Sequence, residues 1–122
     1  MMPSTTAVRR GDVVLVQFQF EQAPGSPPPP IKRRPCLVLS SDWYHSGRQE
    51  TILAAVTSNQ ARPLLPGEVR LQRWSEAGLL KPSTVTMILR TVKQAAVLEK
   101  LGRLGPEELD RVDESFRRSV DL

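Results

Sequence analysis

Short apolar segments separated by turn-forming residues constrain the fold of this chain more than any other feature. Residues 13–20 (VVLVQFQF) alternate, with Val14, Val16 and Phe18 on one side and Val13, Leu15 and Gln17 on the other, which is typical of a half-buried β-strand. Further strand candidates cover residues 36–40, 51–58, 68–72 and 83–92. The sequence therefore predicts a mainly β protein.

Two segments of the chain are predicted to be a loop and a turn rather than strands. Four consecutive prolines at 27–30 rule out the interior of a helix or a sheet, so residues 21–34 are predicted to form a stiff loop that presents a basic cluster. Residues 41–50 (SDWYHSGRQE) are rich in turn formers, and we expect a turn there.

A helix is predicted at the C-terminal end, over residues 105–120. Pro106 suits a first helical turn, and Leu109, Val112 and Phe116 recur at spacings of three and four. Together the elements indicate an α+β fold, a small antiparallel β-barrel with one C-terminal helix packed on it. We expect a single domain over residues 1–122, with a flexible N-terminal tail at 1–8.

Charge is distributed unevenly along the 122 residues. The net charge is +4, but residues 107–121 hold six acids and three bases, so the remainder carries +7. A basic body favours a polyanion such as nucleic acid as partner. A membrane partner is not expected, because no apolar run approaches the roughly 18 residues of a membrane span. A single cysteine and the absence of a secretory pattern favour the cytoplasm.

Few residues could support catalysis. With one histidine and one cysteine, neither a metal site nor a catalytic triad is indicated, and His45 is expected to be an ordinary turn residue. Arg34, held by Pro35, and Thr57 at a strand end suit phosphodiester chemistry on RNA, in which the substrate supplies its 2′-hydroxyl as nucleophile. The alternative is that these residues form a solvated basic loop and a plain strand-end turn.

Other residues are candidates for holding RNA. Trp43 could stack on an unpaired base, or could instead cover the core. The predicted RNA-binding set is Lys32, Arg33, Ser58, Asn59, Trp43 and Arg90.

Five motifs in order carry a family resemblance: RRGDVVLVQFQF, KRRPCLVLSSDWY, ILAAVTSN, AGLLKPSTV and LGRLGPEELDRVDESFRRSV. Over residues 9–120 the chain resembles the MazF/PemK toxins of type II toxin–antitoxin systems. The resemblance implies a homodimer of small SH3-like barrels of the CcdB/MazF type that cuts single-stranded RNA without a metal ion or cofactor. It also implies a cognate antitoxin with an acidic tail.

The resemblance assigns roles to two residues. Arg34, the arginine before the proline, would stabilise the charge on the phosphorane and could protonate the leaving 5′-oxygen. Thr57, the threonine that closes the ILAAVT segment, would hold the scissile phosphate or assist proton transfer at the 2′-hydroxyl.

The chain departs from the family pattern at two places. In the segment 25–34 (GSPPPPIKRR), prolines follow Gly25-Ser26 where many members carry Gly-Ser-Glu-Gln, so that segment offers no carboxylate base. Many members also have an acid and a glutamine just before an Ile-Arg-Thr sequence, whereas here Thr86-Met87-Ile88-Leu89 precede Arg90-Thr91. These departures keep open an alternative function, a non-cleaving RNA- or protein-binding module on the same fold, such as a target-poisoning toxin like CcdB.

Overall fold

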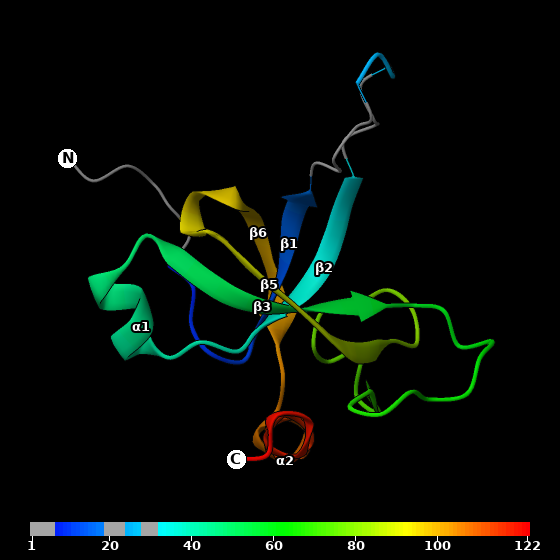
Figure 1. The fold of residues 1–122 in the computed structure, drawn as a ribbon. Helices are drawn as coiled ribbons and strands as arrows, with labels where there is room; N and C mark the ends of the chain where they lie inside the picture. The colour runs from blue at the N-terminus through cyan, green and yellow to red at the C-terminus, as the bar shows by residue number, and fades with distance from the viewer. Residues whose placement is uncertain (1–6, 19–23, 28–31) are drawn as a thin grey trace.

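A computed structural model describes residues 7–18, 24–27 and 32–122 (Figure 1). Among these residues, six strands form one sheet in the order β4-β5-β3-β2-β1-β6, and each pair of neighbours is antiparallel. The predicted fold class, mainly antiparallel β with a C-terminal helix, is confirmed. The elements in chain order are β1 (Asp12–Phe18), β2 (Lys32–Val38), α1 (Asp42–Gly47), β3 (Glu50–Thr57), β4 (Val69–Arg70), β5 (Thr84–Lys93), the 3-10 turn η1 (Gln94–Ala96), β6 (Val97–Arg103) and α2 (Pro106–Val120).

The central strands are buried on both faces, because separate apolar clusters cover the two sides of the sheet. Val13 and Leu37 belong to a cluster that includes Val112 of α2. Their neighbours Val14 and Cys36 belong to a second cluster on the other side. The prediction of a half-buried first strand is therefore wrong, since Val13 is also only 1% exposed.

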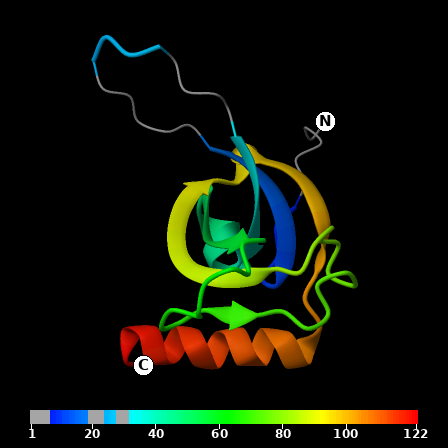
Figure 2. The same cartoon turned by 90° about the vertical axis from the view of Figure 1, so that its right-hand side faces the viewer.

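The sheet is strongly curved, so its two edges, at β4 and β6, approach each other (Figure 2). The segment after β4 packs against β6. This contact is tight at two glycines. A Cβ atom at Gly78, whose φ is +86°, would lie 2.0 Å from the backbone oxygen of Leu101, and one at Gly102 would lie 2.2 Å from that of Ala77. Only hydrogen fits at both positions, so the segment before β5 is held firmly on β6.

The helix α2 lies below β4 and closes one side of the fold (Figure 2). It begins at Pro106, one residue later than predicted. The buried carboxylate of Glu108 accepts hydrogen bonds from the backbone N–H groups of Gln72 (2.7 Å) and Arg73 (3.1 Å). Glu108 therefore fixes the start of the long connection between β4 and β5.

Several element bounds differ from the predictions. The strand predicted over 36–40 begins earlier, at Lys32, and residues 19–20 of the first predicted strand lie outside the described residues. The predicted turn over 41–50 contains α1, whose N-cap Ser41 accepts a hydrogen bond from the N–H of Tyr44. The sixth strand, β6, was not predicted. Of the expected tail over 1–8, residues 1–6 lie outside the described residues and Val8 is 5% exposed.

Candidate active site

A cavity of about 430 Å³ lies where β2 and β3 meet the segment before β5. It brings together three of the predicted site residues, Arg34, Thr57 and Ser58, over a partly apolar floor. Its lining consists of Leu15, Arg34, Pro35, Val56, Thr57, Ser58, Gly78, Leu79, Leu80, Lys81, Ser83 and Leu101.

Arg34 and Thr57 lie at the same end of two neighbouring strands. The β2–β3 ladder runs from Val38 opposite Leu53 to Cys36 opposite Ala55. Arg34 on β2 and Thr57 on β3 lie beyond this last pair, and both line the cavity. A guanidinium and a hydroxyl therefore share one cavity.

The turn after β3 fixes the direction of the Thr57 hydroxyl. Thr57 Oγ1 accepts a hydrogen bond from the backbone N–H of Asn59 at 3.2 Å. The Asn59 side chain accepts one from the N–H of Ala61 at 3.0 Å, so its amide oxygen is used within the turn. Because Thr57 Oγ1 is already an acceptor, its own proton remains available for a phosphate oxygen.

The cavity is electropositive. Arg34 is exposed, and among the described residues neither Arg34 nor Lys81 has a carboxylate within ion-pair distance. No described residue of the lining is acidic. Such a site favours a phosphate group, for which the fork of an arginine is well suited.

Sequence reasoning did not single out Lys81. The residue lies in the AGLLKPSTV segment, between Leu80 and Pro82, and reaches this cavity only through tertiary packing. The available signal was a lysine beside a proline just before a predicted strand.

The remaining predicted residues lie outside the cavity lining. Lys32 and Arg33 are exposed and continue the basic run from Arg34 toward the start of β2 (Figure 1). Arg90 lies on β5, opposite Leu53 of β3. Lys32 and Arg33 extend the basic surface beside Arg34, whereas Arg90 lies level with Leu53 and Val38, toward the other end of β2. Contact of these residues with RNA stays a prediction.

Trp43 lies on α1, which follows the opposite end of β2 from Arg34 (Figure 1). Its side chain is 85% exposed, so the suggestion that it covers the core is wrong. It borders a shallow cavity with Arg9 and Arg103 rather than the cavity at Arg34. Base stacking by Trp43 therefore requires an RNA that extends across the protein.

Cys36 lies next to the site on β2. Burial raises the pKa of its thiol to about 12, although the positive charge of Arg90 acts in the opposite direction. The thiol is therefore protonated at neutral pH and is not a nucleophile there.

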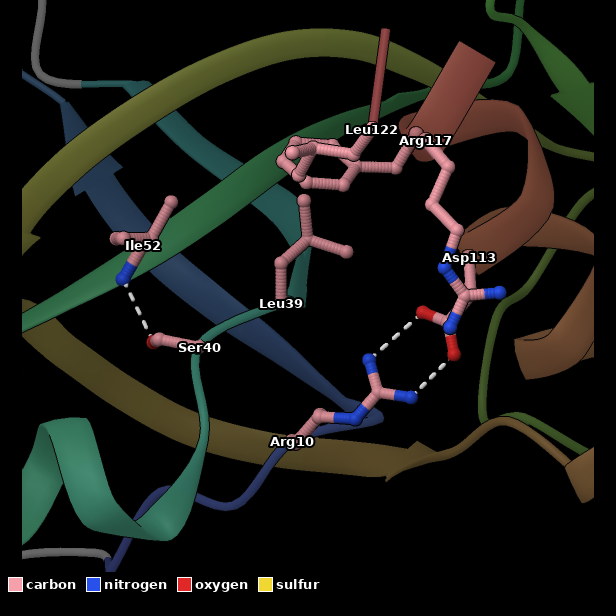
Figure 3. Close-up of a pocket in the computed structure, with 8 residues that line it drawn as sticks. Arg10, Leu39, Ser40, Ile52, Asp113, Arg117 and Leu122 are labelled. Carbon is pink, nitrogen blue, oxygen red and sulfur yellow. Dashed lines mark hydrogen bonds and ion pairs between the residues drawn. The ribbon is translucent and has the colours of Figure 1, made fainter. Parts of the chain in front are cut away.

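A second cavity, of about 320 Å³, lies between α2 and the sheet (Figure 3). Leu39 and Ile52 form its sheet side, and Leu122 lies across from them. At its edge the Arg10 guanidinium forms a two-pronged ion pair with Asp113, with Nη1 donating to Oδ1 at 2.7 Å. Because the Arg10–Asp113 pair links the segment before β1 to α2 at its edge, we interpret this cavity as the seam that joins the helix to the sheet.

Beside this seam, His45 anchors α1. Its Nε2 lies 2.6 Å from Ser40 Oγ and 3.1 Å from Thr51 Oγ1, and Ser40 Oγ also accepts from the N–H of Ile52 at 2.9 Å. The expectation of an ordinary turn histidine is wrong, since His45 is half-buried and holds a helix on the sheet. It does not line the cavity at Arg34.

Comparison with known families covers nearly the whole chain. A family model described as "PemK-like, MazF-like toxin of type II toxin-antitoxin system" matches residues 9–120. The chain belongs to the PemK/MazF toxin family.

Individual members of the PemK/MazF family support this assignment. The chain is 36% identical over 107 residues to the endoribonuclease MazF6 of Mycobacterium tuberculosis, covering 86% of this chain and 93% of that protein. It is 28% identical over 116 residues to the endoribonuclease EndoA of Bacillus subtilis, covering 94% and 96% of the two chains.

Solved structures agree on the fold. A MazE–MazF structure from Deinococcus radiodurans superposes with a TM-score of 0.72 at 21% identity, covering 94% of this chain and 96% of that one. The M. tuberculosis toxin MazF-mt6 gives a TM-score of 0.70 at 20% identity, covering 91% and 97%. The predicted MazF-like fold is confirmed.

Two features are absent from the part of the chain that the structure describes. This part contains no helix that is both long and apolar enough to cross a membrane. It also contains no group of three or more His, Cys, Asp or Glu side chains arranged to hold a metal ion.

Proposed function

We propose that this chain is the endoribonuclease toxin of a type II toxin–antitoxin pair, and that it cuts single-stranded RNA at a preferred short sequence without a metal ion. The observation that carries the proposal is the shared cavity of Arg34 and Thr57, with an arginine that no described carboxylate neutralises. Family membership and the named endoribonuclease relatives support it.

The reaction uses a nucleophile of the substrate. The 2′-oxygen attacks the adjacent phosphorus and loses its proton, and the bond from phosphorus to the 5′-oxygen breaks. The products are a 2′,3′-cyclic phosphate and a 5′-hydroxyl, which takes up one proton. The protein must stabilise the negative charge that grows on the phosphoryl oxygens and assist these two proton transfers.

Arg34 and Thr57 match these requirements. Two guanidinium N–H groups of Arg34 can donate to the phosphoryl oxygens as negative charge develops, which lowers the barrier. Thr57 can donate its hydroxyl proton to the same phosphate, since its oxygen already accepts from the N–H of Asn59. Ser58 offers a further hydroxyl on the same side of the cavity.

The proton acceptor for the 2′-hydroxyl is not a described residue of this cavity. Its described lining holds no carboxylate and no histidine. We therefore expect solvent to accept the proton, so that the rate of cutting rises with pH through the neutral range.

We also propose that the protein works in the cytoplasm as a homodimer and is inhibited by a cognate antitoxin with an acidic tail. The D. radiodurans structure named above holds MazE together with MazF. An acidic tail would suit the electropositive cavity and the exposed Lys32 and Arg33 beside it.

One observation favours a second function, a non-cleaving binding module. Ile88 and Leu89, in the segment where many family members carry an acid and a glutamine, are 60% and 41% exposed on β5. Met87 beside them has a φ of +60°, at the point where the β3–β5 register shifts. An exposed apolar bulge of this kind suits a protein partner better than an RNA phosphate.

The deciding experiment incubates the purified protein with a long unstructured RNA in excess EDTA and maps cuts by primer extension. Arg34→Ala and Thr57→Ala are prepared in parallel. Cuts at a recurring short sequence that vanish in both variants support the endoribonuclease. An intact RNA would support the binding module instead.

A further inference from the structure

Leu80 and Lys81 form a projection at the edge of the cavity, opposite the strand that carries Arg34. Leu79 before them is 7% exposed and belongs to the core, and Ser83 after them is 4% exposed. Leu80 itself is 94% exposed, although it is a large apolar residue that also lines the cavity. The projection is therefore held at both ends, and its tip is open to solvent.

Hydrogen bonds and close packing fix this projection. The N–H of Leu79 donates to the oxygen of Trp74 at 3.1 Å, and the Ser83 hydroxyl donates to the Lys81 oxygen at 2.7 Å. Gly78 contacts the backbone of β6 so closely that no Cβ could be added. A ligand that binds to the tip would lose little free energy in ordering it.

Lys81 provides a second positive charge in the cavity. No described carboxylate lies within ion-pair distance of its ammonium group. An RNA strand carries one phosphate per nucleotide, and Lys81 lines the same cavity as Arg34, so it is placed to bind the phosphate next to the one that Arg34 holds. A compact ammonium suits that non-reacting phosphate as a point charge.

Leu80 provides the apolar contact that a base next to that phosphate requires. Its neighbours in the cavity include Leu15, Val56 and Leu101, so the wall behind it is apolar as well. An unstacked base exposes two apolar faces. Contact between one of these faces and Leu80 would remove that face and the leucine side chain from water.

We propose that Leu80 and Lys81 form a substrate-positioning rim, in which Lys81 binds the phosphate next to the scissile one and Leu80 packs on the adjoining base. This rests on the proposed function for the identity of the ligand, single-stranded nucleic acid. Neither residue takes part in bond making or breaking.

The test measures binding of a short, unstructured single-stranded DNA oligonucleotide, which has no 2′-hydroxyl and cannot be cut through one. Affinity is measured across a salt series for the full chain and for Lys81→Met, Lys81→Arg and Leu80→Ser. Lys93→Met is the matched control, because Lys93 lies at the far end of the β3–β5 pair, opposite Glu50.

We expect Lys81→Met to weaken binding about tenfold at low salt, the effect of losing one charge-assisted hydrogen bond. It should also lower the slope of log affinity against log salt by about 0.7, the value for one phosphate contact on a single strand. Lys81→Arg should restore the slope. Leu80→Ser should weaken binding several-fold with the slope unchanged, because it removes no charge.

Binding and slope that stay at the level of the Lys93→Met control in both Lys81→Met and Leu80→Ser would overturn the proposal. A chain that binds the oligonucleotide through Lys81 but never cuts RNA would refute the endoribonuclease and leave the rim in place. A chain that cuts RNA but whose binding of the oligonucleotide is undetectable would refute the rim and leave the endoribonuclease in place.

Discussion

Replacing Arg34 with alanine should separate activity from stability. Arg34 is exposed on β2, and no described carboxylate pairs with it. Its removal takes away no buried contact and no ion pair among the described residues. The free energy of unfolding should therefore change by no more than about 0.5 kcal/mol, and Tm by about 2 °C.

The same substitution should lower the rate of RNA cutting at least about a hundredfold. Arg34 is the only arginine among the described residues of the cavity lining, so no second fork-shaped donor can replace it. Loss of one preorganised donor to a developing oxyanion costs about 10²- to 10³-fold in kcat, or about 2.7–4 kcal/mol of barrier. The fall should appear in kcat, because the interaction strengthens as charge develops in the transition state.

The assay compares single-turnover cutting rates and melting curves of the unsubstituted chain, Arg34→Ala and Arg33→Ala. Arg33 is the matched control, since it is the adjacent exposed arginine of β2 and does not line the cavity. Arg33→Ala should weaken binding modestly and leave kcat close to the unsubstituted value. Equal losses of kcat in both variants, or a Tm that falls by many degrees in Arg34→Ala, would refute the reasoning.

Three further predictions concern stability and reactivity. Gly102→Ala should lower Tm by several degrees, because its Cβ would lie 2.2 Å from a backbone oxygen of the segment before β5. Gly47→Ala, at the end of α1 with nothing within 4 Å, should be nearly neutral in the same melting assay, and similar Tm values for the two variants would contradict the packing argument. Burial raises the pKa of the Cys36 thiol to about 12, so at pH 8 it should react with a colorimetric thiol reagent at least about a hundredfold more slowly in the folded protein than in denaturant. Equal rates in the two states would show that the thiol is accessible. The hydrogen-bonded Arg62 lowers the pKa of Glu68 in the folded protein. The stability that this pair contributes should therefore be present above pH about 4.3, the pKa of an unperturbed glutamate, and be lost as the pH falls through the lower pKa of the folded state. In denaturant titrations Glu68→Gln should lose less stability over that acid range, and an acid profile identical to that of the unsubstituted chain would exclude the pair as a contributor.

Local patterns in the sequence were sufficient for α2 and most strands. Pro106, with apolar positions three and four residues apart, predicts the helix that the structure contains. The strand β6 was missed because Val97 is its one buried apolar residue, while Leu98, Glu99 and Lys100 are exposed. An edge strand of this composition has no alternation to detect.

Sequence reasoning singled out residues on one wall of the candidate cavity, Arg34, Thr57 and Ser58, but not Lys81 on another. Arg34 and Thr57 are marked by a following proline and by a strand end, and both line the cavity where β2 and β3 end side by side. Lys81 enters the cavity because Gly78 docks on β6, a contact between distant segments that no local pattern contains. His45 was misread for the same reason, since its partner Thr51 is a buried residue of β3.

The most direct test of the proposed chemistry replaces one nucleotide at a mapped cutting site with its 2′-deoxy counterpart. The account predicts that cutting at that bond disappears while other sites in the same RNA are still cut in EDTA, and that the normal product carries a 2′,3′-cyclic phosphate. Cutting at the 2′-deoxy position would show that water or a protein group is the nucleophile, and would contradict the roles given to Arg34 and Thr57.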